Sequence, residues 1–146
     1  MSRNASMASI CSAAALALVL SAAPAMAKTV MLRGDLTGGA VNPPSGSKAS
    51  GEIEVKLDPD TKKITWKGHY QGLRSEETAA HFHGPAGPGQ NAAPVLPVDA
   101  ANGKFEGEAT LDAKQVEQLE NGRWYFNLHT DKHPDGALRG QLMRVR

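Results

Sequence analysis

Histidine is the residue type in this sequence with the clearest capacity for chemistry. Two of the five histidines, His81 and His83, stand two residues apart. In a β-strand, side chains with this spacing leave the same face, about 6–7 Å apart. His129 lies on the polar face of another strand-like segment, so three imidazoles converge if the two strands are neighbours.

Three neutral imidazoles suit Cu(II) or Zn(II), and the affinity order of divalent metals favours copper. We therefore predict a mononuclear metal site formed by His81, His83 and His129, with copper as the first candidate and zinc as the alternative. His133 becomes a fourth ligand if its loop swings inward. The alternative is a structural network, in which His81 and His83 bond loop carbonyls and the Thr130 hydroxyl.

Other side chains give weaker chemical signals. We expect Arg139 to form a salt bridge with Asp131 or Asp135. Tyr125 shares the parity of His129, and we expect it on the surface or supporting a ligand. The sequence shows no nucleophile–base pair, phosphate loop or paired catalytic carboxylates, so no catalytic residue is assigned.

Short alternating segments separated by turns are the elements that must position these histidines. Residues 53–57 alternate apolar and charged side chains, and 64–70 repeat the pattern after a turn at 58–61, which predicts a hairpin. On the solvent-exposed faces of these strands, we expect Lys56 and Lys104 to pair with glutamates of neighbouring strands.

The histidines lie in the next strands. We predict strands over 79–83, 95–98, 104–111 and 124–129, with Trp124, Phe126 and Leu128 buried, and a last strand over 138–145. The segment 84–94 is rich in Gly and Pro and predicts a loop. One helix is predicted over 113–120, because Asp112 and Gln115 form a capping-box pattern and Gly122 can end it.

Composition bounds the class of protein. The chain has 146 residues, 40% hydrophobic, 21% charged and 5% aromatic, which predicts one globular domain. The 16 basic and 15 acidic residues give a net charge of +1, which excludes a strongly basic nucleic-acid binder.

The N-terminus has the pattern of a signal peptide over 1–27. Arg3 precedes an apolar run at 10–20, and Ala-Met-Ala at 25–27 fits a cleavage site. We predict an exported domain over 28–146, periplasmic or secreted and without stable membrane insertion, since the run is shorter than the roughly 20 residues that span a bilayer. Cys11, the only cysteine, lies within the predicted signal peptide and is removed with it. Thiol ligands and disulfides are therefore excluded for the predicted exported domain.

Three segments carry a family resemblance. Residues 79–86 read AAHFHGPA, 122–130 read GRWYFNLHT and 136–142 read GALRGQL, and together they resemble the CHRD domain, the module of the developmental protein chordin. The resemblance covers 28–146. It implies an antiparallel Greek-key β-sandwich, like those of copper-zinc superoxide dismutase and the immunoglobulins.

The histidine pattern is also similar to the copper ligands of that dismutase, a His-x-His on one strand and a third His on its neighbour. The dismutase topology puts His69 in the other sheet, so we expect it not to be a ligand. The loop 84–94 has no His or Asp, so the zinc site and bridging histidine of the enzyme are missing.

Two functional hypotheses follow from these patterns. The first is an exported copper-binding protein that sequesters or delivers the metal. The second is a non-enzymatic module that binds a protein or a cell-surface component, with structural histidines. A redox enzyme such as a dismutase is the least favoured interpretation.

Overall fold

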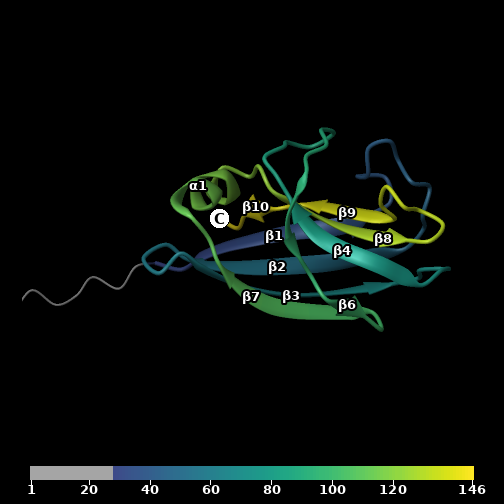
Figure 1. Cartoon of the computed structure of the whole chain (residues 1–146), viewed down its shortest axis with the longest axis horizontal. Helices are drawn as coiled ribbons and strands as arrows, with labels where there is room; N and C mark the ends of the chain where they lie inside the picture. Colours follow the sequence, from purple (N-terminus) through teal and green to yellow (C-terminus); the bar gives the residue numbers. More distant parts are fainter. Residues whose placement is uncertain (1–27) are drawn as a thin grey trace, which may run out of the picture.

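The computed structural model describes residues 28–146, and the predicted signal peptide, residues 1–27, lies outside the described residues. Within the described part, the fold is all-β with one short helix, as predicted (Figure 1). The elements are β1 (Val30–Thr37), β2 (Ser50–Asp58), β3 (Lys63–Gln71), β4 (Glu77–His83), β5 (Pro94–Pro97), β6 (Ala100–Ala101), β7 (Lys104–Thr110), α1 (Ala113–Glu120), β8 (Tyr125–Thr130), β9 (Leu138–Gln141) and β10 (Met143–Arg144).

The strands form one curled antiparallel sheet. Its order is β5-β4-β8-β9-β1-β2-β3-β7-β6, and β10 pairs with β1 beside this path. The curl brings β4 and β8 over β3 and β7 (Figure 1). Phe105 of β7 stacks on Phe126 of β8 with ring centroids 4.5 Å apart, and Trp66 of β3 meets Phe82 of β4 at 5.1 Å. The two halves of the sheet therefore pack as the two layers of a sandwich.

Side-chain alternation explains which face of each strand is inside. On β2, the apolar side chains Ile53, Val55 and Leu57 are fully buried, and their polar neighbours face outward. The predicted inward faces of β4 and β8 are confirmed, because Phe82, Phe126 and Leu128 are also fully buried. The core consequently lies between the layers, and the odd-numbered residues of β4 and β8 face away from it.

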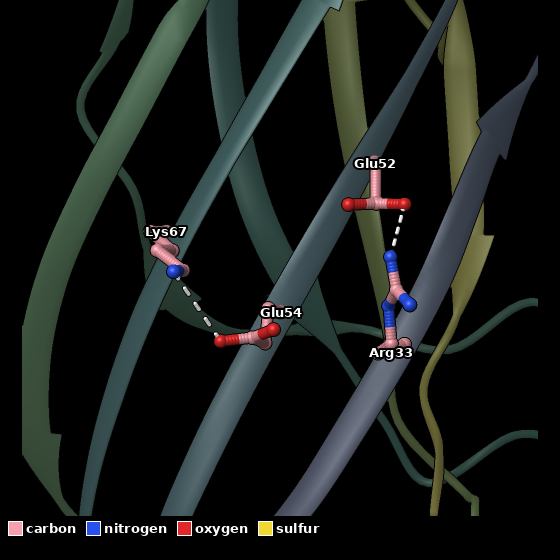
Figure 2. Close-up of polar contacts among 4 residues, drawn as sticks. All are labelled: Arg33, Glu52, Glu54 and Lys67. Atoms are coloured by element: carbon pink, nitrogen blue, oxygen red, sulfur yellow. Dashed lines mark hydrogen bonds and ion pairs between the residues drawn. The ribbon is translucent and has the colours of Figure 1, made fainter. Parts of the chain in front are cut away.

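The outer face of β1, β2, β3 and β7 carries cross-strand ion pairs: Arg33–Glu52, Lys67–Glu54 and Lys63–Glu108. Figure 2 shows the first two of these pairs. The expectation that Lys56 and Lys104 pair with these glutamates was wrong, since neither lysine takes part in any of the three ion pairs. These pairs are largely exposed and each contributes only about 0–1 kcal/mol.

The helix has the bounds and the cap that the sequence predicts. Asp112 accepts a hydrogen bond from the Gln115 backbone N–H (2.7 Å), and the Gln115 side chain accepts one from Asp112 N–H (2.9 Å). The last predicted strand is instead split into β9 and β10. Its break is the buried Leu142, whose N–H donates to the Trp124 carbonyl (2.9 Å) rather than to a neighbouring strand. No helix in residues 28–146 is long and apolar enough to cross a bilayer.

Candidate metal centre

The antiparallel pairing of β4 with β8 brings the predicted ligands together. In its register, His81 lies opposite Asn127 and His83 lies opposite Tyr125. Residues directly opposite in an antiparallel pair point to the same face of the sheet. His129 is two residues beyond Asn127 on β8 and shares this face, so all three histidines project from the outer side of the β4–β8 pair.

One ring nitrogen from each of His81, His83 and His129 lies within 4.8 Å of the corresponding nitrogens of the other two. The ring centroids are 5.5–6.0 Å apart. Two metal–nitrogen bonds of about 2 Å place ligand nitrogens about 3–4 Å from one another. Small rotations of the rings are therefore enough to surround one ion.

Hydrogen bonds from two loops fix two of the rings. The Nδ1 of His83 bonds the Ala92 carbonyl (2.9 Å), and the Nδ1 of His129 bonds the Pro134 carbonyl (2.8 Å). A carbonyl only accepts, so each of these Nδ1 atoms carries the proton. The Nε2 of each ring then holds a lone pair, which is the state a metal ligand needs.

The remaining nitrogens lack partners. Nδ1 of His81 and the Nε2 atoms of His83 and His129 are buried without a hydrogen-bond partner in residues 28–146. Buried polar atoms in native proteins are nearly always paired. Here one unpaired nitrogen belongs to each of the three rings, which together match the donor set of a metal site.

Burial also favours the neutral, ligating form of two rings. The His83 side chain is 7% exposed, and burial lowers its pKa, although the hydrogen bond to the Ala92 carbonyl acts to raise the pKa. Burial likewise lowers the pKa of His81, and the neighbouring His129 lowers it further. Because protons compete with metals for imidazole, both effects favour metal binding near neutral pH.

The three histidines are less exposed to solvent than their position on the outer face of the sheet predicts. The 84–93 loop, between β4 and β5, folds over His83, and buried Arg139 holds it there. The guanidinium donates to the carbonyls of Gln90 (2.7 Å) and Gly87 (2.9 Å) and to the Gln141 side chain (2.9 Å). The histidines thus line a partly covered site between a sheet and a loop.

The expected salt bridge of Arg139 with Asp131 or Asp135 was wrong. Arg139 lies opposite Asn127 in the β8–β9 register, so its side chain shares the outer face with the histidines and extends under the loop. Both aspartates are exposed in the turn that follows β8. The guanidinium bonds neutral oxygens instead.

Tyr125 is buried and supports His83, which is the second of the two positions expected for it. The two rings are stacked, with centroids 4.9 Å apart and planes 9° apart. Its hydroxyl accepts a hydrogen bond from Ala92 N–H (3.0 Å). The Arg139 guanidinium carbon lies 3.6 Å from the centroid of the Tyr125 ring. Arg139, Tyr125 and His83 therefore form a continuous stack. Strand parity predicted the face on which Tyr125 lies, but not this stacking.

The other two histidines lie elsewhere. His69 is exposed on β3, opposite Glu52 and Lys104. His133 lines a separate hollow that includes Lys48, and it is not part of the three-histidine group. The Thr130 hydroxyl accepts from the backbone N–H of His133 (3.1 Å), not from the His81 or His83 ring. Of the expected structural bonds, the one to a loop carbonyl is present at His83.

A hollow of about 770 Å³ opens at the seam where β4 approaches β6 and β7. Its apolar lining includes Val98 and Phe105, while Glu77 and Asp99 add carboxylates. His81 also borders it, so the hollow and the histidine cluster adjoin at β4.

Comparison with known proteins gives one match. The sequence model of the CHRD domain matches residues 32–142, which is most of the chain. Neither the curated proteins nor the solved structures yield a match. CHRD domains are typically extracellular. By this match over most of its length, the chain belongs to the CHRD domain family.

Proposed function

We propose that this CHRD domain binds a metal ion, copper in the first place and zinc as the alternative, through His81, His83 and His129. The observation that carries the proposal is the set of three buried, unpaired ring nitrogens on side chains whose ligand atoms converge within 4.8 Å. Imidazole nitrogen is a preferred donor for both metals, and copper binds more tightly in the divalent series.

Each ligand has a defined role. His83 and His129 bind through Nε2, because the Ala92 and Pro134 carbonyls occupy their Nδ1 protons. His81 binds through its unpaired Nδ1. Carbonyl partners of this kind orient ligating imidazoles and raise their basicity.

The proposed role is copper sequestration or delivery outside the cytoplasm. The predicted signal peptide and the extracellular character of the family support this location. The cluster also favours exchange, because His81 and His129 are only half-buried and an ion can reach them from solvent.

Titration of the exported form with Cu(II), Cu(I) and Zn(II), followed by calorimetry and competition with chelators, tests the proposal. Replacing His81 or His83 by Ala should abolish tight binding and leave the circular dichroism spectrum unchanged. His69→Ala is the matched control, because His69 is exposed on the opposite layer. Wild-type affinity in the His81→Ala protein would refute the metal site.

The second candidate function is a non-enzymatic interaction module. The hollow at the β4–β6–β7 seam favours it, since a concave site with apolar lining and carboxylates suits recognition of another molecule. Asp99→Ala, at an exposed carboxylate that lines the hollow, would then impair partner binding, while His129→Ala would not. Loss of metal binding confined to the histidine variants supports the first function instead.

A further inference from the structure

We propose that the buried cation of Arg139 makes the three-histidine site selective for monovalent copper, Cu(I), over divalent ions. The inference rests on the proposed function, because it concerns the ion that the same three histidines bind. It adds a specificity-determining residue that does not itself touch the metal.

The charge inventory of the site supports this selectivity. The group that could hold the ion contains three imidazoles and, among the described residues, no carboxylate. Arg139 is 2% exposed, and the oxygens that accept its hydrogen bonds belong to backbone carbonyls and side-chain amides. A metal ion at the histidines therefore meets a fixed positive charge that no acceptor on Arg139 neutralises.

The stack places this charge close to the ligands. The Arg139 carbon is 3.6 Å from the Tyr125 centroid, which is 4.9 Å from the His83 centroid, so cation and His83 ring are at most about 8.5 Å apart. Both Tyr125 and His83 are buried, and the Tyr125 ring fills the space between them. Coulomb repulsion is proportional to the charge of the bound ion, so a divalent ion is disfavoured twice as strongly as a monovalent one.

The number of ligands acts in the same direction. Cu(II) prefers tetragonal coordination and Zn(II) a tetrahedral set, so each would have to recruit at least one further donor, such as water, beyond the three histidines. His133, the expected fourth ligand, lines a different hollow. Three converging nitrogens satisfy Cu(I), which accepts three-coordinate geometry.

The competing interpretation is that Arg139 only holds the 84–93 loop. Charge and loop attachment can be separated by three variants. Arg139→Gln removes the cation, and Arg139→Lys retains it. Asn42→Ala is the neutral control, because the Asn42 side chain donates to the Gly89 carbonyl (2.8 Å) and so attaches the same loop without bonding Arg139.

The experiment measures dissociation constants of each protein for Cu(I), by anaerobic competition with bicinchoninate, and for Cu(II), by competition with nitrilotriacetate. The wild-type site should have a reduction potential above that of aqueous copper. In Arg139→Gln, the preference for Cu(I) over Cu(II) should fall about tenfold, equivalent to a drop of about 59 mV for one electron. Arg139→Lys should keep most of the preference, and Asn42→Ala should weaken both affinities by the same factor.

Equal weakening of both affinities in Arg139→Gln would overturn the inference and leave the proposed function standing. If that variant does not fold, the wild-type measurement decides, because a site that holds Cu(II) more tightly than Cu(I) also refutes the selectivity. Binding of neither copper ion refutes the inference, and it refutes the proposed function as well if Zn(II) does not bind. Binding that His81→Ala leaves unchanged refutes both.

Discussion

Truncating Phe126 to Ala should remove an aromatic contact between the two layers of the sheet. Phe126 is fully buried on β8. Its ring stacks on Phe105 of β7 at 4.5 Å with planes 7° apart, and meets the edge of Phe82 on β4 at 5.9 Å. The substitution therefore leaves a cavity lined by the rings of Phe105 and Phe82, from two other strands.

The expected cost is about 3–5 kcal/mol of the free energy of unfolding, the range for Phe→Ala in a core. The aromatic pairs favour its upper half, since each adds about 0.5–1.5 kcal/mol beyond burial. Domains of this kind have total stabilities of about 5–15 kcal/mol. Cys11 is the only cysteine of the chain, so no intrachain disulfide compensates.

Urea unfolding followed by tryptophan fluorescence measures the change, with Trp66 and Trp124 both in the core. The midpoint should fall strongly with little change in the slope of the transition. Phe126→Leu should retain more than half of the lost stability, and Lys67→Ala on the exposed face should change it by less than about 0.5 kcal/mol. A loss under about 1.5 kcal/mol in Phe126→Ala would refute the two-layer core described above.

Three further predictions concern the site. Burial lowers the pKa of His81 and His83 below 6.5, so protonation favours the unfolded chain. The stability of the metal-free protein should therefore be constant above pH 6.5 and fall below it. Urea midpoints measured from pH 8 to 5 check this, and a flat profile contradicts it. Gly136→Ala should weaken metal binding about 10–100-fold by calorimetry, since its Cβ would lie 2.4 Å from Asn127 Oδ1 in the turn that carries the Pro134 carbonyl, and unchanged affinity would show that this turn does not position His129. His81→Leu should raise metal-free stability by about 1 kcal/mol, because it removes a buried unpaired nitrogen, whereas a structural histidine predicts a loss.

Alternation and turn chemistry were sufficient to predict most strands and the helix. The pattern of Ile53, Val55 and Leu57 specifies one buried face, and the Asp112–Gln115 cap specifies where α1 begins. The two-residue strand β6 carries no periodic signal, because alternation needs more than two positions. The division of the last strand at Leu142 depends on a hydrogen bond to the Trp124 carbonyl, a contact between distant segments.

The convergence of the histidines could also be predicted, but not their surroundings. Parity places His83 on the outer face of β4, and it holds no information about what covers that face. The covering loop is attached by Arg139 through backbone carbonyls, and a carbonyl is present at every residue. The sequence alone therefore indicated Asp131 or Asp135 as the partner of Arg139, although the guanidinium bonds the loop instead.

The unpaired ring nitrogens favour the proposed metal site over a network that only stabilises the fold. A stabilising network would pair both nitrogens of each buried ring, because each orphan costs about 1–3 kcal/mol. The loops pair the Nδ1 atoms of His83 and His129 and leave the Nε2 atoms without partners, while Nδ1 of His81 is also unpaired. We therefore expect the metal-free site to be less stable than an apolar replacement, and a ligand that binds all three nitrogens to recover that difference. This is the pattern expected of side chains retained for binding at some cost in stability.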